Sequence, residues 1–243
     1  MVKKPHVLIS VVIVILVTAL VSHGRVFFRW GAAAQSLHTL EALGGTLAYQ
    51  AAVNINGGKG QLTVFAFQKS IADVVRELTS AFAITGYHYS GGTMGYGSVS
   101  ANGQTRTLIA LQLGEPPRTI VFHTEQSDED SRRSALPPSG PMLNDIVRFL
   151  DSTPVFFASD ENAGMSVAIS RTQTGEAEVR QALDMDLSGN GWQSAFPSAG
   201  GILAAPRLRV YLKQQQICCV LVDASEKQGE SRITILHKQR GMK

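Results

Sequence analysis

Two stretches of this chain, residues 70–87 (SIADVVRELTSAFAITGY) and residues 175–192 (GEAEVRQALDMDLSGNGW), carry the same apolar pattern. At a constant offset the matched positions are Val74 with Val179, Leu78 with Leu183, Phe82 with Leu187, Gly86 with Gly191, and Tyr87 with Trp192. Apolar positions four apart form one face of a helix, and a glycine followed by an aromatic residue is a typical helix end. The pattern therefore predicts one buried helix, present twice, as an internal repeat.

The segments around each predicted helix follow a common order. A helical pattern at 34–43 precedes strand-like runs at 46–53 and 62–67, and a similar pattern at 142–150 precedes runs at 153–159 and 165–169. Further strand-like runs follow the helices, at 107–113 and 119–123 in the first half and at 208–212, 217–222 and 233–236 in the second. Each half thus reads as helix, β-hairpin, helix and a further hairpin or meander, which predicts an α+β fold of two tandem, mainly antiparallel two-layer sandwiches.

A polar segment separates the halves. Residues 126–141 (QSDEDSRRSALPPSGP) combine charge, serine, proline and glycine with almost nothing to bury. We expect a tail, anchor and juxtamembrane segment at 1–33, a first module at 34–126, a linker at 127–141, and a second module with a basic tail at 142–243. Whether the two modules share one sheet is left open.

The N-terminal region predicts a membrane-spanning helix. Residues 5–24 contain no Asp, Glu, Lys or Arg, and 7–21 are nearly all Val, Ile and Leu. Twenty such residues form about 30 Å of helix, the thickness of a bilayer core. Lys3 and Lys4 favour a cytoplasmic N-terminus and an extracytoplasmic body. Removal of the segment as a cleaved signal peptide, and the opposite orientation, are the alternatives.

Composition excludes several classes of partner and chemistry. The net charge is only +3, from 22 basic and 19 acidic residues, and no basic run is interleaved with aromatics, so nucleic acid is not an expected partner. The two cysteines, Cys218 and Cys219, are adjacent in an apolar run, where successive strand residues point to opposite faces. We expect buried small hydrophobes there, not a metal or redox site, and their redox state is left open.

The glycine-rich segment 86–103 (GYHYSGGTMGYGSVSANG) is the strongest candidate for a functional loop. It lacks the Gly-Lys-Ser/Thr of a phosphate-binding loop, and it follows a helix where a dinucleotide fingerprint would precede one. Two interpretations are open, a flexible β-connection and an aromatic surface for a partner. The candidate interaction residues are Tyr87, His88, Tyr89 and Tyr96.

No catalytic, cofactor-binding or metal-binding motif is found, so none of these residue roles is assigned. The sequence favours a membrane-anchored, non-catalytic interaction or assembly module of the cell envelope, for example in a secretion or pilus-type machine, with other envelope proteins as partners. The alternatives are an extracytoplasmic ligand-binding or sensing module with its site between the repeats, whose small-molecule ligand is unknown, and an enzyme with a spatially assembled site.

Overall fold

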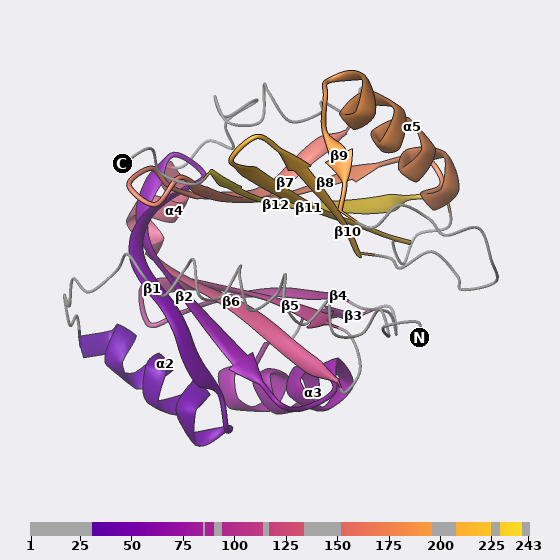
Figure 1. Cartoon of the computed structure of the whole chain (residues 1–243). Helices are drawn as coiled ribbons and strands as arrows, with labels where there is room; N and C mark the ends of the chain where they lie inside the picture. Colours follow the sequence, from indigo (N-terminus) through magenta and orange to yellow (C-terminus); the bar gives the residue numbers. More distant parts are fainter. Residues whose placement is uncertain are drawn as a thin grey trace, which may run out of the picture. The chain divides into compact units, whose positions relative to one another are not determined.

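The computed structural model describes residues 31–84, 86–89, 94–113, 117–133, 152–195, 208–224 and 229–239 (Figure 1). The chain divides into two compact units. The first comprises the chain up to Val53 and Lys59–Arg132, and the second comprises Asn54–Gly58 and the chain from Arg133 onward.

The first unit is an antiparallel sheet with helices. Its elements are α2 (Gly31–Ala42), β1 (Thr46–Ile55), β2 (Gly58–Phe67), α3 (Ile71–Phe82), β3 (His88–Tyr89), β4 (Met94–Ala101), β5 (Gln104–Leu113), β6 (Arg118–Ser127) and α4 (Asp128–Arg133). The strand order is β3-β4-β5-β6-β2-β1. The pairs β4–β5, β5–β6 and β2–β6 are antiparallel without a register shift.

The hairpin between β1 and β2 turns on two residues. Asn56 and Gly57 have positive φ angles of 49° and 91°, as the mirror-image turns of two-residue hairpins require, and the Gly57 N–H donates to Asn54 Oδ1. The tip of this hairpin belongs to the second unit, where Asn54 and Ile55 pair with Ser159 and Ala158.

Helix α3 packs on one face of the first sheet. The Ser70 side chain accepts a hydrogen bond from the Asp73 N–H and so caps the first turn. The helix ends when Ala83 adopts the left-handed conformation at φ 52°, three residues before Gly86. Its buried face joins α2 and the sheet in one core, made of Leu40, Phe65, Phe67, Ile71, Val74, Val75, Leu78, Ile84, Leu108, Ala110 and Val121.

In the second unit, as in the first, a β-hairpin is followed by a helix and four strands. Its elements are β7 (Thr153–Asp160), β8 (Met165–Thr172), α5 (Glu176–Gly189), β9 (Gln193–Ser194), β10 (Leu208–Lys213), β11 (Gln216–Ala224) and β12 (Ser231–Gln239). The strand order is β9-β10-β11-β12-β8-β7, all antiparallel. The one register irregularity in this part of the chain separates Pro154 from Phe156 in β7.

The core of the second unit lies between α5 and its sheet. Helix α5 ends before Gly191, whose φ of 81° suits glycine, and the Trp192 N–H donates to the Leu187 carbonyl over 2.9 Å. This core comprises Phe157, Ala168, Val179, Leu183, Leu187, Trp192, Tyr211, Cys218, Val220, Val222, Ile233 and Ile235.

These findings correct the expected fold class, which is wrong. Antiparallel sheet dominates the described residues, and α3 and α5 are each followed by four successive strands where the sequence predicted a hairpin or a meander. One cause is residues 94–101: they contain two glycines, which favour a loop, yet they form β4. The description of the chain as an α+β protein is therefore also wrong.

The expected membrane-spanning helix is also not part of the fold that the structure defines. Among the described residues, no helix has both the length and the apolar character needed to cross a bilayer. The segment that carried this prediction, residues 5–24, lies outside the described residues, as do most of the predicted linker and the predicted helix at 142–150. Strand β6 extends to Ser127 and α4 follows it, where the sequence predicted the start of the linker.

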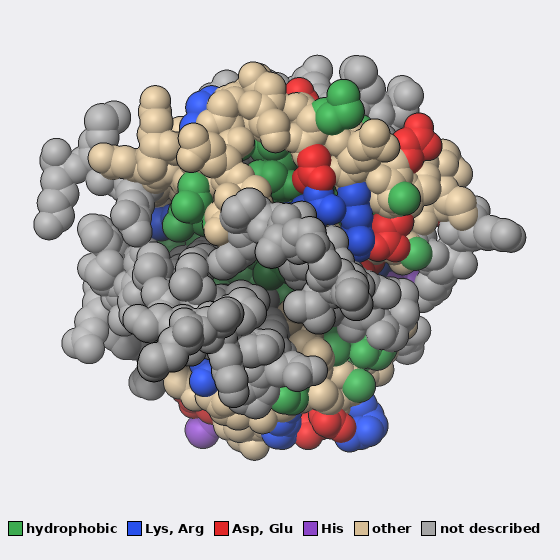
Figure 2. Space-filling view, turned by 45° about the vertical axis from the view of Figure 1, so that its right-hand side comes forward, with side chains coloured by type: hydrophobic (Ala, Val, Ile, Leu, Met, Phe, Trp, Pro, Cys, Tyr) green, Lys and Arg blue, Asp and Glu red, His purple; other side chains and the backbone are tan. Residues whose placement is uncertain are grey.

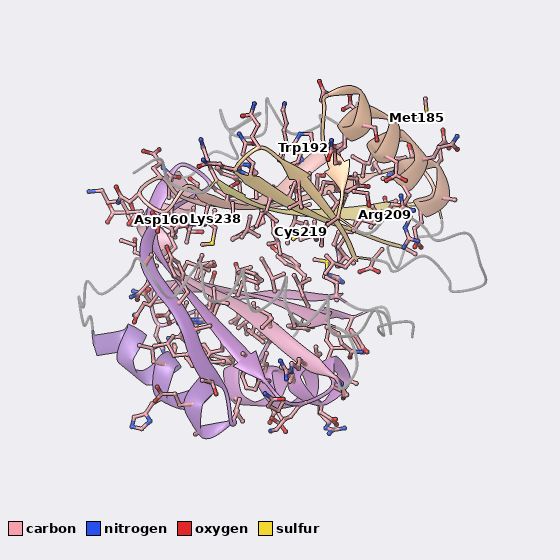
Figure 3. The ribbon with its side chains drawn as sticks, viewed as in Figure 1. Asp160, Met185, Trp192, Arg209, Cys219 and Lys238 are labelled. Carbon is pink, nitrogen blue, oxygen red and sulfur yellow. The ribbon has the colours of Figure 1, made fainter. Side chains whose placement is uncertain are left out.

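The packing of α5 generates a stability prediction. Leu183 is 2% exposed and Met185, two residues along the same helix, is 68% exposed and points away from the sheet (Figure 3). We expect Leu183→Ala to lower the free energy of unfolding by about 2–5 kcal/mol, through lost burial and a residual cavity. Met185→Ala is the matched control and should change it by less than about 0.5 kcal/mol in urea titrations. Equal effects of the two substitutions would contradict the placement of α5.

Candidate functional site

The aromatic residues predicted as an interaction surface lie in and beside β3 and β4, but they do not form one exposed patch. His88 pairs with Tyr96 and Tyr89 with Gly95 across the β3–β4 ladder. His88 is exposed, whereas Tyr89 and Tyr96 are half-buried. His88, Tyr89 and Tyr96 lie in paired strands. Their positions therefore give little support to a flexible loop at this part of the segment 86–103.

Tyr87 serves the packing of the first unit. A Cβ atom at Gly95 would lie 2.5 Å from Tyr87 Cε1, and one at Gly97 would overlap the same ring. Burial raises the pKa of the Tyr87 hydroxyl. The two glycines of the Gly-Tyr-Gly sequence in β4 thus leave the space that the Tyr87 ring fills.

The matched helix positions lie in the two cores. The buried ones are Val74, Leu78, Val179, Leu183, Leu187 and Trp192, all at most 3% exposed. Phe82 is half-buried and its ring lies 5.6 Å from that of His123, while Gly86 is exposed. These residues hold helices on sheets, and their positions suggest no ligand.

A buried polar cluster fixes α2 to the first sheet. Glu125 Oε1 accepts hydrogen bonds from Ser36 Oγ of α2 at 2.5 Å and from Arg106 Nε of β5 at 2.8 Å. His123 Nε2 lies 3.9 Å from the same oxygen, and its side chain is 2% exposed. Burial lowers the pKa of His123 to about 4, although the Glu125 carboxylate acts in the opposite direction. None of these contacts joins Ser36 to His123, so the cluster lacks the serine–histidine contact of a catalytic triad.

A second polar cluster fixes α5 to β10. The Tyr211 hydroxyl donates to Asp184 Oδ1, and Arg209 forms an ion pair with Asp184 Oδ2. Next to it, Lys213 Nζ lies 6.0 Å above the Trp192 ring, in the range of a cation–π contact. Asp184, Tyr211 and Arg209 contact one another, which indicates a structural role, whereas the buried indole N–H of Trp192 has no hydrogen-bond partner among the described residues.

Other reactive groups are buried. Cys218 and Cys219 are free thiols at 0% and 3% exposure, and burial raises the pKa of both, that of Cys219 to about 12. Thiols with raised pKa values are poor nucleophiles and metal ligands.

Lys238 lies beside Asp160 (Figure 3) and donates to the Ala163 carbonyl, which holds the β7–β8 turn. No group of three or more His, Cys, Asp or Glu in the described part of the chain could hold a metal ion.

The central strands of each sheet carry buried side chains at successive positions. In β5, the neighbouring residues Leu108 and Ile109 are each 0% exposed, and in β11 Val220 and Leu221 are 3% and 2% exposed. Adjacent strand residues point to opposite faces, so side chains on both sides of these strands are buried at these positions. On the visible surface, acidic and basic side chains are interspersed (Figure 2). The strand edges then become the candidate sites.

Strand β1 has an edge that can accept another strand. In an antiparallel ladder, successive residues direct their backbone groups to alternate sides. The Asn56 N–H donates to Phe157 of β7, and Asn54 pairs with Ser159, so even-numbered residues of this strand point away from β2. Among the described strands, none lies along β1 on that side before Asn54. Outward backbone groups therefore belong to Thr46, Ala48, Gln50 and Ala52.

The composition of β1 leaves this edge unprotected. Its sequence, TLAYQAAVNI, contains neither a charged residue nor a proline, and Leu47 is 39% exposed on it. Natural sheets normally block their edges with charges, prolines, bulges or short strands. The second unit uses several of these devices: Pro154 and a register irregularity in β7, and Arg209 and Lys213 in β10. Side-chain patterns in the sequence do not reveal this edge, because an edge is a property of the backbone.

Comparison of the chain with known proteins finds no matching family, no matching characterised sequence and no matching solved structure. The geometry of the described residues is therefore the basis for the function proposed below.

The burial of His123 predicts an acid-sensitive stability of the first unit. The folded pKa of about 4 lies below the ordinary value of 6.5, so between these pH values the unfolded chain binds more protons than the folded chain. Stability should therefore fall as the pH falls from 6.5 toward 4, by about 2 kcal/mol at pH 5 relative to pH 7. Urea unfolding at both pH values measures this loss.

The loss should largely disappear in His123→Phe, which keeps a ring beside Phe82 but cannot take up a proton. His88→Asn, at an exposed histidine of the same unit, is the control and should retain the loss. An unchanged pH dependence in His123→Phe would show that other groups cause the acid sensitivity.

Proposed function

We propose that this protein is a non-catalytic interaction or assembly module that binds a partner by strand addition at the edge of β1. The observation that carries this proposal is the uncharged edge with outward backbone groups at four alternate residues, from Thr46 to Ala52. Strand addition derives its affinity from backbone hydrogen bonds and its specificity from contacts with alternate side chains. Leu47, already partly exposed, supplies an apolar contact beside that edge.

The structural roles of the polar side chains support the same proposal. Glu125 and Asp184 each accept contacts from two residues and so hold α2 and α5 on their sheets. Both thiols are buried within the second unit. These two carboxylates and the two thiols are thus used in packing, whereas the edge of β1 carries no charge or proline that would block a further strand.

The location outside the cytoplasm and the identity of the partners as other envelope proteins remain predictions from the sequence. The ligand-binding alternative and the enzyme alternative also remain predictions, because no contact or distance among the described residues favours either one.

Site-specific photo-crosslinking tests the proposed function. A photoreactive amino acid at Leu47 should form an adduct with a protein in cells that express the chain, and mass spectrometry identifies that protein. The same substitution at Met185 is the matched control, since it is exposed and apolar but lies on α5. The purified adduct partner should then bind the purified chain in a titration, and Gln50→Lys should weaken this binding at least tenfold.

Equal yields of the same adduct at Leu47 and Met185 would contradict binding at β1. Binding by the purified partner that is unaffected by Gln50→Lys would also contradict it.

A further inference from the structure

We infer that the strand added at β1 is the β1 strand of a second copy of this chain. This inference rests on the proposed function and names its partner. Three properties of β1 favour self-pairing: its charge, its backbone register, and the part of the edge that is already occupied.

The first property is the absence of charge. When a strand pairs with its own copy, any charged residue is repeated on the partner, and like charges facing one another are destabilising. All ten residues of β1 are uncharged, so self-pairing brings no like charges together. The counterpart of β1 in the second unit, β7, is less suitable because it carries Pro154.

The second property is the register. Antiparallel pairing requires that residues with outward backbone groups face one another, so even-numbered residues must pair with even-numbered residues. A two-fold arrangement that pairs Thr46 with Ala52 and Ala48 with Gln50 of the second copy meets this requirement. All four of these residues have outward backbone groups. The two-fold axis repeats both pairs, so the ladder contains four residue pairs. Leu47 then faces Ala51 of the second copy, which covers part of its exposed side chain.

The third property is the existing occupation of the strand end. Asn54 already pairs with Ser159, so a register that extended to Asn54 would compete with β7. The register given above ends at Ala52 and leaves that pair intact. The side chains along the outward positions are small or flexible (Thr46, Ala48, Gln50 and Ala52), which permits close approach of a second backbone.

Seven residues on each copy form a small contact. Interfaces of this kind lie below the area of stable complexes, so we expect a weak dimer, with a dissociation constant on the order of 10–100 µM. Self-association should therefore be concentration-dependent and reversible.

Sedimentation velocity of the full-length chain over a range of concentrations, in one non-ionic detergent, tests this inference. The wild-type chain should shift from one copy to two. Gln50→Lys should weaken the dimer at least tenfold, because it places two ammonium groups on diagonal positions of the paired strands. Gln104→Lys, a change of the same kind at a similarly half-buried glutamine in β5, should leave the dimer unchanged. Both variants keep the N-terminal segment, so association through that segment affects them equally.

Ala48→Pro provides a second variant. It removes one outward N–H but none of the backbone bonds to β2, so it should weaken the dimer while the circular dichroism spectrum and the melting temperature stay close to those of the wild type. A wild-type chain that remains one copy up to several hundred µM would overturn the inference. So would equal weakening by Gln50→Lys and Gln104→Lys. If photo-crosslinking at Leu47 captures a different protein that binds β1 and the chain itself stays monomeric, the self-pairing fails while the proposed function stands.

Discussion

The pairing of backbone N–H and C=O groups is the constraint on which the structure of this protein depends. The central strands of both sheets are buried, so an unpaired backbone group inside them would cost about 1–3 kcal/mol. Antiparallel ladders satisfy these groups from β4 to β2 in the first unit and from β10 to β7 in the second. At the edge of β1, the same alternation of backbone groups leaves outward-facing donors and acceptors. The candidate site is thus a direct consequence of the fold.

The polar side chains are arranged around the same sheets. Helices attach through few charged contacts: Ser36 of α2 reaches Glu125 in β6, and Asp184 of α5 reaches Arg209 and Tyr211 in β10. The helix-facing positions beside these contacts are apolar. The Arg106–Glu125 pair is largely buried, so desolvation offsets much of its attraction, whereas the Arg209–Asp184 pair is partly exposed. This arrangement explains why residues that look reactive in the sequence lie in structural positions.

Part of the fold could be predicted from the sequence and part could not. The apolar spacing of Val74 and Leu78 predicts a buried helical face, and both residues are buried in α3. The end of α3 could not be predicted from Gly86, because Ala83 adopts the left-handed conformation first. Strand β4 could not be predicted because Gly95 and Gly97 disfavour a strand locally, and their presence is explained by the Tyr87 ring, which packs over them. The expected α+β sandwich failed for this reason: tertiary contacts overrode local preference.

The candidate site was even less visible in the sequence. A search for side-chain chemistry finds residues such as His88 or Tyr96, whereas the β1 edge depends on which strands are neighbours. One signal was present, namely that residues 46–55 contain no charge and no proline, but it indicates an open edge only when the strand order is known. The polar cluster at Glu125 was missed for a similar reason. Ser36 and Arg106 are distant in sequence, and the fold brings them to one oxygen.

Residue-resolved amide hydrogen exchange in β1, at a concentration where the chain is a single copy, measures whether this edge is open. An open edge predicts an alternating pattern, with fast exchange at Ala48, Gln50 and Ala52 and slow exchange at Leu47 and Ala51, whose N–H groups face β2. The fast set should become protected when the concentration is raised and the strand pairs. Uniform protection along β1 in the single copy would contradict the account, because it would mean that the edge is already closed.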